Sequence, residues 1–311
     1  MTQTEMDETQ ARVTVLAQIV SREVLGGMGL RPPGLPYRLA QVLARPGVMR
    51  MARLLAQADA EAGRRGLHAA GEVLLERLAT SCTAQGAEGV PAEGPVLITA
   101  NHPGGLELLA LLAQVRRPDV RVLSNPQPFL QAMPHVSPAM LYLSADSAGY
   151  FTAIRQVVSQ LQAGRAVIVF PAGQMEPDPG VTPGAVEFLE RWSASTGVYL
   201  HKVPETRLVP AALTGIVSPR AVQSLFVRGR RPPKARQRTA AFLQLMVQLL
   251  ARDRWPIHLR LVFGAPVGAR ELSPELDPQT LTAGTRALTA RLLERLGALP
   301  SVGVPFTGEG A

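Results

Sequence analysis

The chain has 311 residues, 46% hydrophobic and 18% charged, so it is long enough for one or two domains and too apolar for a disordered polymer. Its single cysteine, Cys82, excludes an internal disulfide and a cysteine-based metal site. The formal net charge is +8, and Lys202 and Lys234 are the only lysines, so arginine supplies nearly all the positive charge. A basic surface fits nucleic acid, anionic lipid or a phosphorylated substrate, and it also fits a bias toward arginine codons.

Residues 1–88 predict a helical region. Apolar residues at helical spacing predict helices over 13–25, 37–44, 48–62 and 68–78, with Gly26-Gly27 ending the first. The acidic, polar start of the chain is unlike the basic first part of a secretory signal.

Residues 89–300 predict an α/β domain, followed by a flexible tail over 301–311. Apolar runs predict strands over 96–99, 120–123, 166–170, 206–212 and 257–263. Helical patterns between them cover 106–115, 151–163, 186–195, 235–252 and 279–296. We expect a mixed, mostly parallel sheet flanked by helices, with a ligand site beyond the carboxyl ends of the strands.

Two predicted strands run directly into turns rich in proline and glycine. The first continues into residues 101–107, which include His102 and Glu107, and the second into Phe170–Gln174. The turn between His102 and Glu107 can bring the carboxylate to one imidazole nitrogen and leave the other as a base. Spacing alone equally allows a histidine that caps the turn and a glutamate that favours a helix N-terminus.

Four short motifs occur in one order and resemble the glycerolipid acyltransferases of the lysophosphatidic acid acyltransferase superfamily. The family pattern N-H-x-x-x-x-D is similar to residues 101–107, and F-P-E-G is similar to residues 170–173. A glycine followed six residues later by arginine matches Gly149 and Arg155, and a strand ending in V-P-x matches residues 209–211. The N-H-P and F-P-A-G forms resemble the hemolysin-like and ornithine-lipid branch.

The resemblance implies a metal-independent lipid O-acyltransferase of phospholipid biosynthesis, with no cofactor. An acyl group would pass from acyl-CoA or acyl carrier protein, as co-substrate, to the hydroxyl of a lysolipid-type acceptor. His102 would be the general base and Glu107 would orient it. Main-chain N–H groups around Gly173 would stabilise the oxyanion or hold the acceptor. The implied substrate-binding residues are Asn101, Gly104, Gly149, Arg155, Phe170, Pro171, Ala172, Gly173, Gln174 and Pro210.

The chain departs from the family pattern at three positions. Glu107 replaces the aspartate, Ala172 replaces the glutamate of F-P-E-G, and Met175 stands where many members have an arginine that grips the acceptor phosphate. The missing arginine argues against lysophosphatidic acid as acceptor, and Gln174 and Glu176 would hold an amide or amine head group instead.

No segment predicts a transmembrane helix, because the longest uncharged run, residues 122–145, contains four prolines. That run fits an acyl-chain tunnel, a bilayer contact or an ordinary buried region. We expect a cytoplasmic protein held peripherally on the inner face of the membrane. The predicted contact stretch comprises Arg45, Met49, Arg50, Met51, Arg53, Leu54 and Leu55.

The remaining patterns separate other partners and functions. The run 228–238 holds six cations and fits a solvated loop, lipid head groups or the phosphates of CoA. Nucleic acid is not expected, because aromatic residues do not interleave with the cations. His68, His135 and His258 have no acidic partner nearby in sequence, and His201 falls in a predicted loop. A non-catalytic lipid- or acyl-carrier-binding protein and a basic nucleic-acid-binding protein remain alternatives.

Overall fold

A computed structural model of the chain describes residues 3–27, 32, 34–143, 149–229, 233–252 and 254–298. The strands in these ranges form one eight-stranded sheet in the order β1-β7-β6-β2-β5-β3-β4, with β8 paired to β6. The strands are β1 (Ser81–Gln85), β2 (Val96–Ala100), β3 (Arg121–Ser124), β4 (Met140–Tyr142), β5 (Ala166–Val169), β6 (Arg207–Thr214), β7 (His258–Phe263) and β8 (Val267–Gly268). Only the β6–β7 and β6–β8 pairs are antiparallel.

Helices surround the sheet. They are α1 (Gln3–Gly27), α2 (Leu35–Arg65), α3 (Leu67–Leu78), α4 (Glu107–Gln114), α5 (Pro128–Gln131), α6 (Gly149–Gln162), α7 (Ala185–Phe188), α8 (Ser195–Lys202), α9 (Pro219–Gln223), α10 (Leu225–Arg228), α11 (Pro233–Leu250), α12 (Ala269–Leu272) and α13 (Pro278–Ala298). Short 3₁₀ turns cover Ala87–Gly89, Ser137–Ala139 and Leu189–Arg191.

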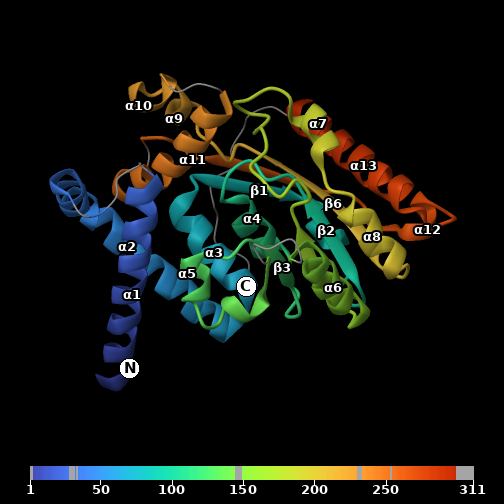
Figure 1. Cartoon of the computed structure of the whole chain (residues 1–311), viewed down its shortest axis with the longest axis horizontal. Coiled ribbons are helices and arrows are strands. Elements are labelled where there is room, and N and C mark those ends of the chain that lie inside the picture. The colour runs from blue at the N-terminus through green and yellow to red at the C-terminus, as the bar shows by residue number, and fades with distance from the viewer. Residues whose placement is uncertain are drawn as a thin grey trace.

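Successive strand residues point to opposite faces of the sheet, and each face packs on its own helices (Figure 1). Ile98 and Val209 lie in the larger core cluster, with residues from α1–α4 and α11. Leu97 and Leu208 lie in a second cluster, with residues from α6, α8 and α13. The predicted fold class, a mixed and mostly parallel sheet with helices on both faces, is confirmed.

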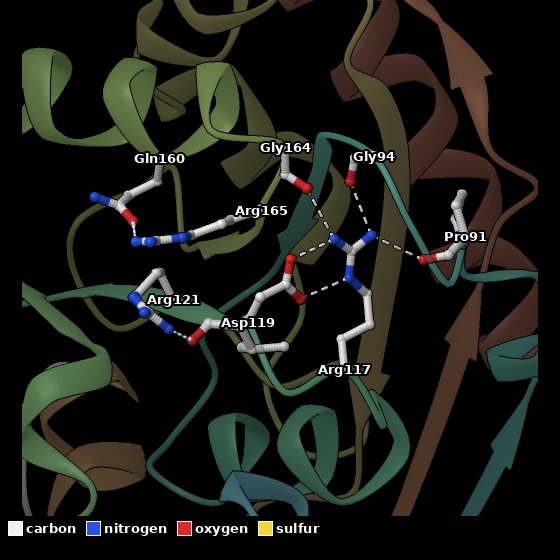
Figure 2. Close-up of polar contacts among 9 residues, drawn as sticks. Pro91, Gly94, Arg117, Asp119, Arg121, Gln160, Gly164 and Arg165 are labelled. Carbon is white, nitrogen blue, oxygen red and sulfur yellow. Dashed lines mark hydrogen bonds and ion pairs between the residues drawn. The ribbon is translucent and has the colours of Figure 1, made fainter.

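A buried arginine ties together the loops at the amino ends of the strands (Figure 2). The Arg117 guanidinium binds the Asp119 carboxylate with two hydrogen bonds, of 2.9 and 2.6 Å. It also donates to the carbonyls of Pro91, Gly94 and Gly164, at 3.0, 2.9 and 3.0 Å. These bonds connect the loops that precede β2, β3 and β5, so one side chain holds these loops together at the sheet edge opposite His102.

The structure joins two predicted helices at the N-terminus. The predicted helices 37–44 and 48–62 form one helix, α2, with Pro46 inside it. Pro46 removes one main-chain donor, but the next turn is held by packing, because Gly47 lies against Met246 and Leu250 of α11.

The predicted domain boundary after residue 88 falls inside the folded unit. β1 lies before that boundary and pairs with β7, so residues 81–85 belong to the sheet. Helices α1–α3 share one core cluster with the sheet, so they are part of the same packed unit. The predicted tail over 301–311 lies outside the described residues.

The region after β5 also differs from the prediction. The predicted helix 186–195 is a short α7 followed by a 3₁₀ turn, and the segment with Tyr199 and His201, expected to be a loop, forms α8. Burial explains α8, because Tyr199 and Leu200 are fully buried in the second core cluster. The strands β1, β4 and β8 were missed. β1 is polar and β1 and β4 lie at the sheet edges, where the apolar pattern is weak.

Part of the uncharged run from residue 122 packs into the main core. Val122, Met133, Val136, Ala139 and Met140 are buried in the larger cluster. Residues 144–148 lie outside the described part of the chain. The described part of this run therefore combines these buried side chains with exposed ones, which include Asn125, Pro126, Gln131 and Pro134.

Candidate active site

The turns after β2 and β5 meet at the carboxyl edge of the sheet. β2 and β5 are parallel neighbours in the centre, paired from Val96 with Ala166 to Thr99 with Val169. This pairing places the next residues of each strand side by side. The rings of His102 and Phe170 have centroids 4.9 Å apart and are tilted by 32°. The two motifs, far apart in the chain, therefore form one site.

His102 and Glu107 form an ion pair between imidazole Nδ1 and carboxylate Oε1. Glu107 is the first residue of α4 and is fully buried, whereas the His102 side chain is 33% exposed. The turn formed by residues 103–105 folds the chain back, so the carboxylate lies under the imidazole and at a helix N-terminus that favours negative charge. The engaged Nδ1 leaves Nε2 as the nitrogen that can act on a ligand.

The electrostatic surroundings favour the protonated imidazole. Burial by itself would lower the pKa of His102, but the Glu107 charge, the hydrogen bond to Glu107 and the Glu176 charge outweigh it and raise that pKa above its ordinary value of 6.5. Protonation of His102 is thus stabilised by a carboxylate that is already in place. This is the arrangement expected of a general base that becomes positively charged during a reaction.

Gly104 is required by close packing below the site. A Cβ at Gly104 would lie 2.5 Å from Cγ2 of Ile216, which follows β6. By contrast, a Cβ at Gly105 or Gly173 would meet nothing within 4 Å. Gly105 and Gly173 are exposed, so main chain without side chains lies at the surface in both turns, and the neighbouring Gln174 is also exposed.

Asn101 is bound inside the protein rather than open to a ligand. Its side-chain nitrogen donates to the Leu213 carbonyl at 2.9 Å, and its side-chain oxygen accepts from the Leu213 N–H at 2.8 Å. Asn101 is buried, so its amide continues the β2–β6 ladder by one step beyond the strand. Its predicted contact with substrate is therefore not supported, and its hydrogen bonds instead fix the chain next to His102 to β6.

The turn after β5 is fixed by its own main chain. The Gly173 N–H donates to the Phe170 carbonyl at 3.0 Å, and Gly173 has φ 61°, a conformation that suits glycine. Pro171 is buried and its carbonyl accepts from the Ser193 N–H at 3.0 Å. Ala172 packs against the cluster around α13. Main-chain N–H groups around Gly173 were expected to stabilise an oxyanion or hold the acceptor, and of these the Gly173 N–H itself is already used within the turn.

Two other predicted binding residues, Gly149 and Arg155, belong to α6. Arg155 is exposed in the middle of α6, and its guanidinium donates to Thr152 of the same helix at 3.4 Å. The buried side of α6 packs on the face opposite α4, so the structure does not bring Arg155 to His102. Gly149 begins α6 and is buried.

Pro210 is likewise away from the edge that carries His102. It is buried in mid-strand opposite Thr99, and its carbonyl accepts from the Gly264 N–H at 2.7 Å. β6 continues to Thr214, so the V-P-x motif does not end its strand. The residues of β6 that approach the site are therefore those that follow the motif.

A buried polar network supports the turn that carries His102, and the sequence did not predict it. Glu176 Oε1 accepts from the His102 N–H at 3.0 Å, and Oε2 accepts from Trp192 Nε1 at 3.0 Å. Gln237 of α11 donates to the carbonyls of Pro103 and Glu176, both at 2.7 Å. Glu176 is buried, so it does not hold an acceptor head group as its position suggested.

A second carboxylate–imidazole pair lies outside this site. His135 Nδ1 is 3.0 Å from Oδ2 of the fully buried Asp59, which also accepts from the main-chain N–H groups of His135 and Val136. Arg12 approaches the same carboxylate at 3.4 Å. His135 therefore has an acidic partner after all, but that partner is 76 residues earlier, which local spacing cannot reveal.

The described residues offer two further observations. No three of their histidine, cysteine, aspartate or glutamate side chains gather as ligands for a metal ion. None of the helices in the described ranges combines the length and apolar character needed to cross a bilayer.

No family model matches this chain, and no curated protein matches it. Among solved structures, it is similar to the 1-acyl-sn-glycerophosphate (LPA) acyltransferase PlsC from Thermotoga maritima. The TM-score is 0.44 and the sequence identity is 14%, and the match covers 94% of this chain and 98% of that chain.

Proposed function

We propose that this protein is an acyltransferase that moves a fatty acyl group from acyl-CoA or acyl carrier protein to the hydroxyl group of a lysolipid-type acceptor. One observation carries the proposal: the fully buried Glu107 binds Nδ1 of the partly exposed His102 at the carboxyl end of a central strand. The sequence motifs that resemble the glycerolipid acyltransferases point to a thioester donor and a lipid acceptor.

The reaction follows from the two imidazole nitrogens. Glu107 accepts from Nδ1–H, so Nε2 carries the free electron pair and removes the proton of the acceptor hydroxyl. The oxygen attacks the thioester carbonyl, the C–S bond breaks, and the leaving thiolate takes the proton from the imidazolium. Glu107 stabilises the imidazolium between these steps. No covalent bond to the enzyme forms.

The surroundings of His102 favour a bulky substrate. Gly105 and Gly173 are exposed and leave open space where side chains would stand. Phe170 stacks on His102 from the neighbouring strand and limits how far the imidazole can turn. Met175 supplies no charge for a phosphate, so we propose an acceptor other than lysophosphatidic acid.

We propose that the first turns of α2 rest on an anionic bilayer surface. The stretch predicted from sequence is unsuitable, because Met51, Leu54 and Leu55 are buried in the core. The start of α2 lies at the left margin of Figure 1 and carries an exposed apolar face. Its members follow helical spacing and are between 62% and 79% exposed: Leu35, Leu39, Val42 and Leu43.

Charge supports this partner. Arg38 and Arg45 are exposed on the same turns of α2, where arginines beside an apolar face are suited to anionic head groups. α10 carries two further exposed apolar side chains, Leu225 and Phe226, and both α2 and α10 contact α11.

The activity is tested by thiol release from acyl-CoA and from acyl carrier protein with a panel of lysolipids that includes lysophosphatidic acid and lyso-ornithine lipid. We expect acceptor-dependent release in the wild type, loss in His102→Ala, and retention in His201→Ala, a matched control at an exposed position of α8. If folded wild-type protein releases no thiol with any acceptor, the catalytic proposal is wrong. Acyl-chain binding that survives His102→Ala would then favour a lipid-binding protein.

The membrane contact is tested by sedimentation with phosphatidylglycerol and phosphatidylcholine vesicles. We expect binding to the anionic vesicles that falls at least about tenfold in Leu39→Glu/Leu43→Glu, because two charges replace apolar contacts with the bilayer. Val15→Glu is the matched control, since Val15 is exposed on α1 outside this face. Unchanged binding of the α2 variant would place the contact elsewhere.

A further inference from the structure

Glu176 is a second buried carboxylate beside His102 that the reaction above does not use. Hydrogen bonds join the main chain of His102 to both the side chain and the main chain of Glu176. The His102 N–H donates to Glu176 Oε1 at 3.0 Å, and the Glu176 N–H donates to the His102 carbonyl at 2.8 Å. Glu176 therefore holds the main chain of the residue whose imidazole reacts.

The other groups around Glu176 are neutral donors or are shared with the same turn. Trp192 Nε1 donates to Oε2 at 3.0 Å, and the indole is buried. Gln237 joins the carbonyls of Glu176 and Pro103 through one amide nitrogen. The charged groups that act on Glu176 are His102 and Glu107. The carboxylate of Asp178, two residues on, faces main-chain donors after β6.

We propose that Glu176 is a positioning residue for His102. The Glu176 carboxylate fixes the His102 main chain, and the Glu176 charge sets how readily the imidazole takes up the acceptor proton. This inference rests on the proposed function for its catalytic meaning. The link between Glu176 and His102 itself is independent of any substrate.

The chemistry of the pair supports this role. Burial raises the pKa of Glu176 to about 7, although the hydrogen bonds from Trp192 and from the His102 N–H and the His102 charge act to lower it. The Glu176 charge in turn raises the pKa of His102. Each group thus acts on the protonation of the other, so their titrations are coupled.

Two substitutions separate the geometry from the charge. In Glu176→Gln, the amide nitrogen must face either the His102 N–H or Trp192 Nε1, so one donor opposes another donor. In Trp192→Phe/Glu176→Gln the indole donor is gone, so the amide oxygen can accept from the His102 N–H while the charge is absent. Trp192→Phe alone is the matched background, since it keeps the carboxylate.

The first readout is the titration of the His102 imidazole, monitored by nitrogen-15 NMR in the absence of substrate. The His102 signal is assigned by its loss in His102→Ala. We expect the His102 midpoint in Trp192→Phe/Glu176→Gln to lie lower than in Trp192→Phe by about 0.5 or more on the pH scale, because a nearby negative charge is removed. The second readout is acyl transfer. We expect kcat of Glu176→Gln to fall about tenfold to a hundredfold, because the base is displaced.

The two proposals fail in different ways. A His102 midpoint that differs by less than about 0.2 between the two folded Trp192→Phe variants would overturn the role of the Glu176 charge. An unchanged kcat in Glu176→Gln would overturn its positioning role. If the midpoint moves but wild-type protein transfers no acyl group, the coupling of Glu176 to His102 stands and the proposed function is wrong.

Discussion

Replacing Asp178 by asparagine tests whether one carboxyl group holds together the turn after β5 and the loop after β6, which lie next to the turn that carries His102. Asp178 is fully buried, and its Oδ1 accepts from the Gly180 N–H at 2.9 Å, from Thr214 Oγ1 at 2.9 Å and from the Gly215 N–H at 3.0 Å. Its Oδ2 accepts from the Val217 N–H at 2.8 Å. The group thus connects the turn after β5 with the loop after β6.

The expected magnitude follows from counting these bonds. In Asp178→Asn, the side-chain amide oxygen can keep the three contacts of Oδ1, but the amide nitrogen then opposes the Val217 N–H. The variant loses one hydrogen bond, worth about 1 kcal/mol, and leaves a buried donor unpaired, at about 1–3 kcal/mol. We expect a loss of about 2–4 kcal/mol in the free energy of unfolding, or, for a chain of 311 residues, a Tm lower by about 3–6 °C.

Thermal unfolding followed by circular dichroism and urea titration measures this loss. Thr214→Val is the matched control, because it removes one donor to Oδ1 while two others remain, and we expect a cost of about 1 kcal/mol. Asp178→Ala should cost more than Asp178→Asn, since it leaves every donor unpaired. A Tm of Asp178→Asn within about 1 °C of the wild type would refute the reasoning.

Three other substitutions have defined outcomes. Glu107→Gln should lower the pKa of His102, because the Glu107 charge and hydrogen bond raise it in the wild type. Since the proposed reaction needs the neutral base, the acid limb of the pH–rate profile should then move to lower pH; kcat should fall about a hundredfold or more, and an acid limb at higher pH would contradict this. Gly104→Ala should lower the free energy of unfolding in urea by about 1–3 kcal/mol, because the new Cβ meets Ile216. This loss should be smaller in the Ile216→Ala background, whereas additive losses would show that the two positions do not contact each other. Asp59→Ala should lower the Tm more than His135→Ala, whose imidazole is 46% exposed, and the reverse order would show that the imidazole dominates the cluster.

The sequence by itself was sufficient for the fold class and for the contact between His102 and Glu107. Strand runs such as 96–99 and 166–170 are apolar almost without interruption because their strands are buried on both faces, which is a local property of the residues. The turn between His102 and Glu107 is also local, so their contact could be expected from a short stretch of chain. Edge strands such as β1 lack that pattern and were missed.

The tertiary structure alone decided which other residues belong to the site. The contact of His102 with Phe170 depends on the order of strands in the sheet, and Trp192 and Gln237 reach Glu176 from other elements. Burial also reversed expectations, because Asn101 and Glu176 are polar residues next to His102 and yet are buried against main-chain groups of the protein. A polar side chain in a sequence can face water, a ligand or a buried main-chain group, and only the packing of distant segments determines which.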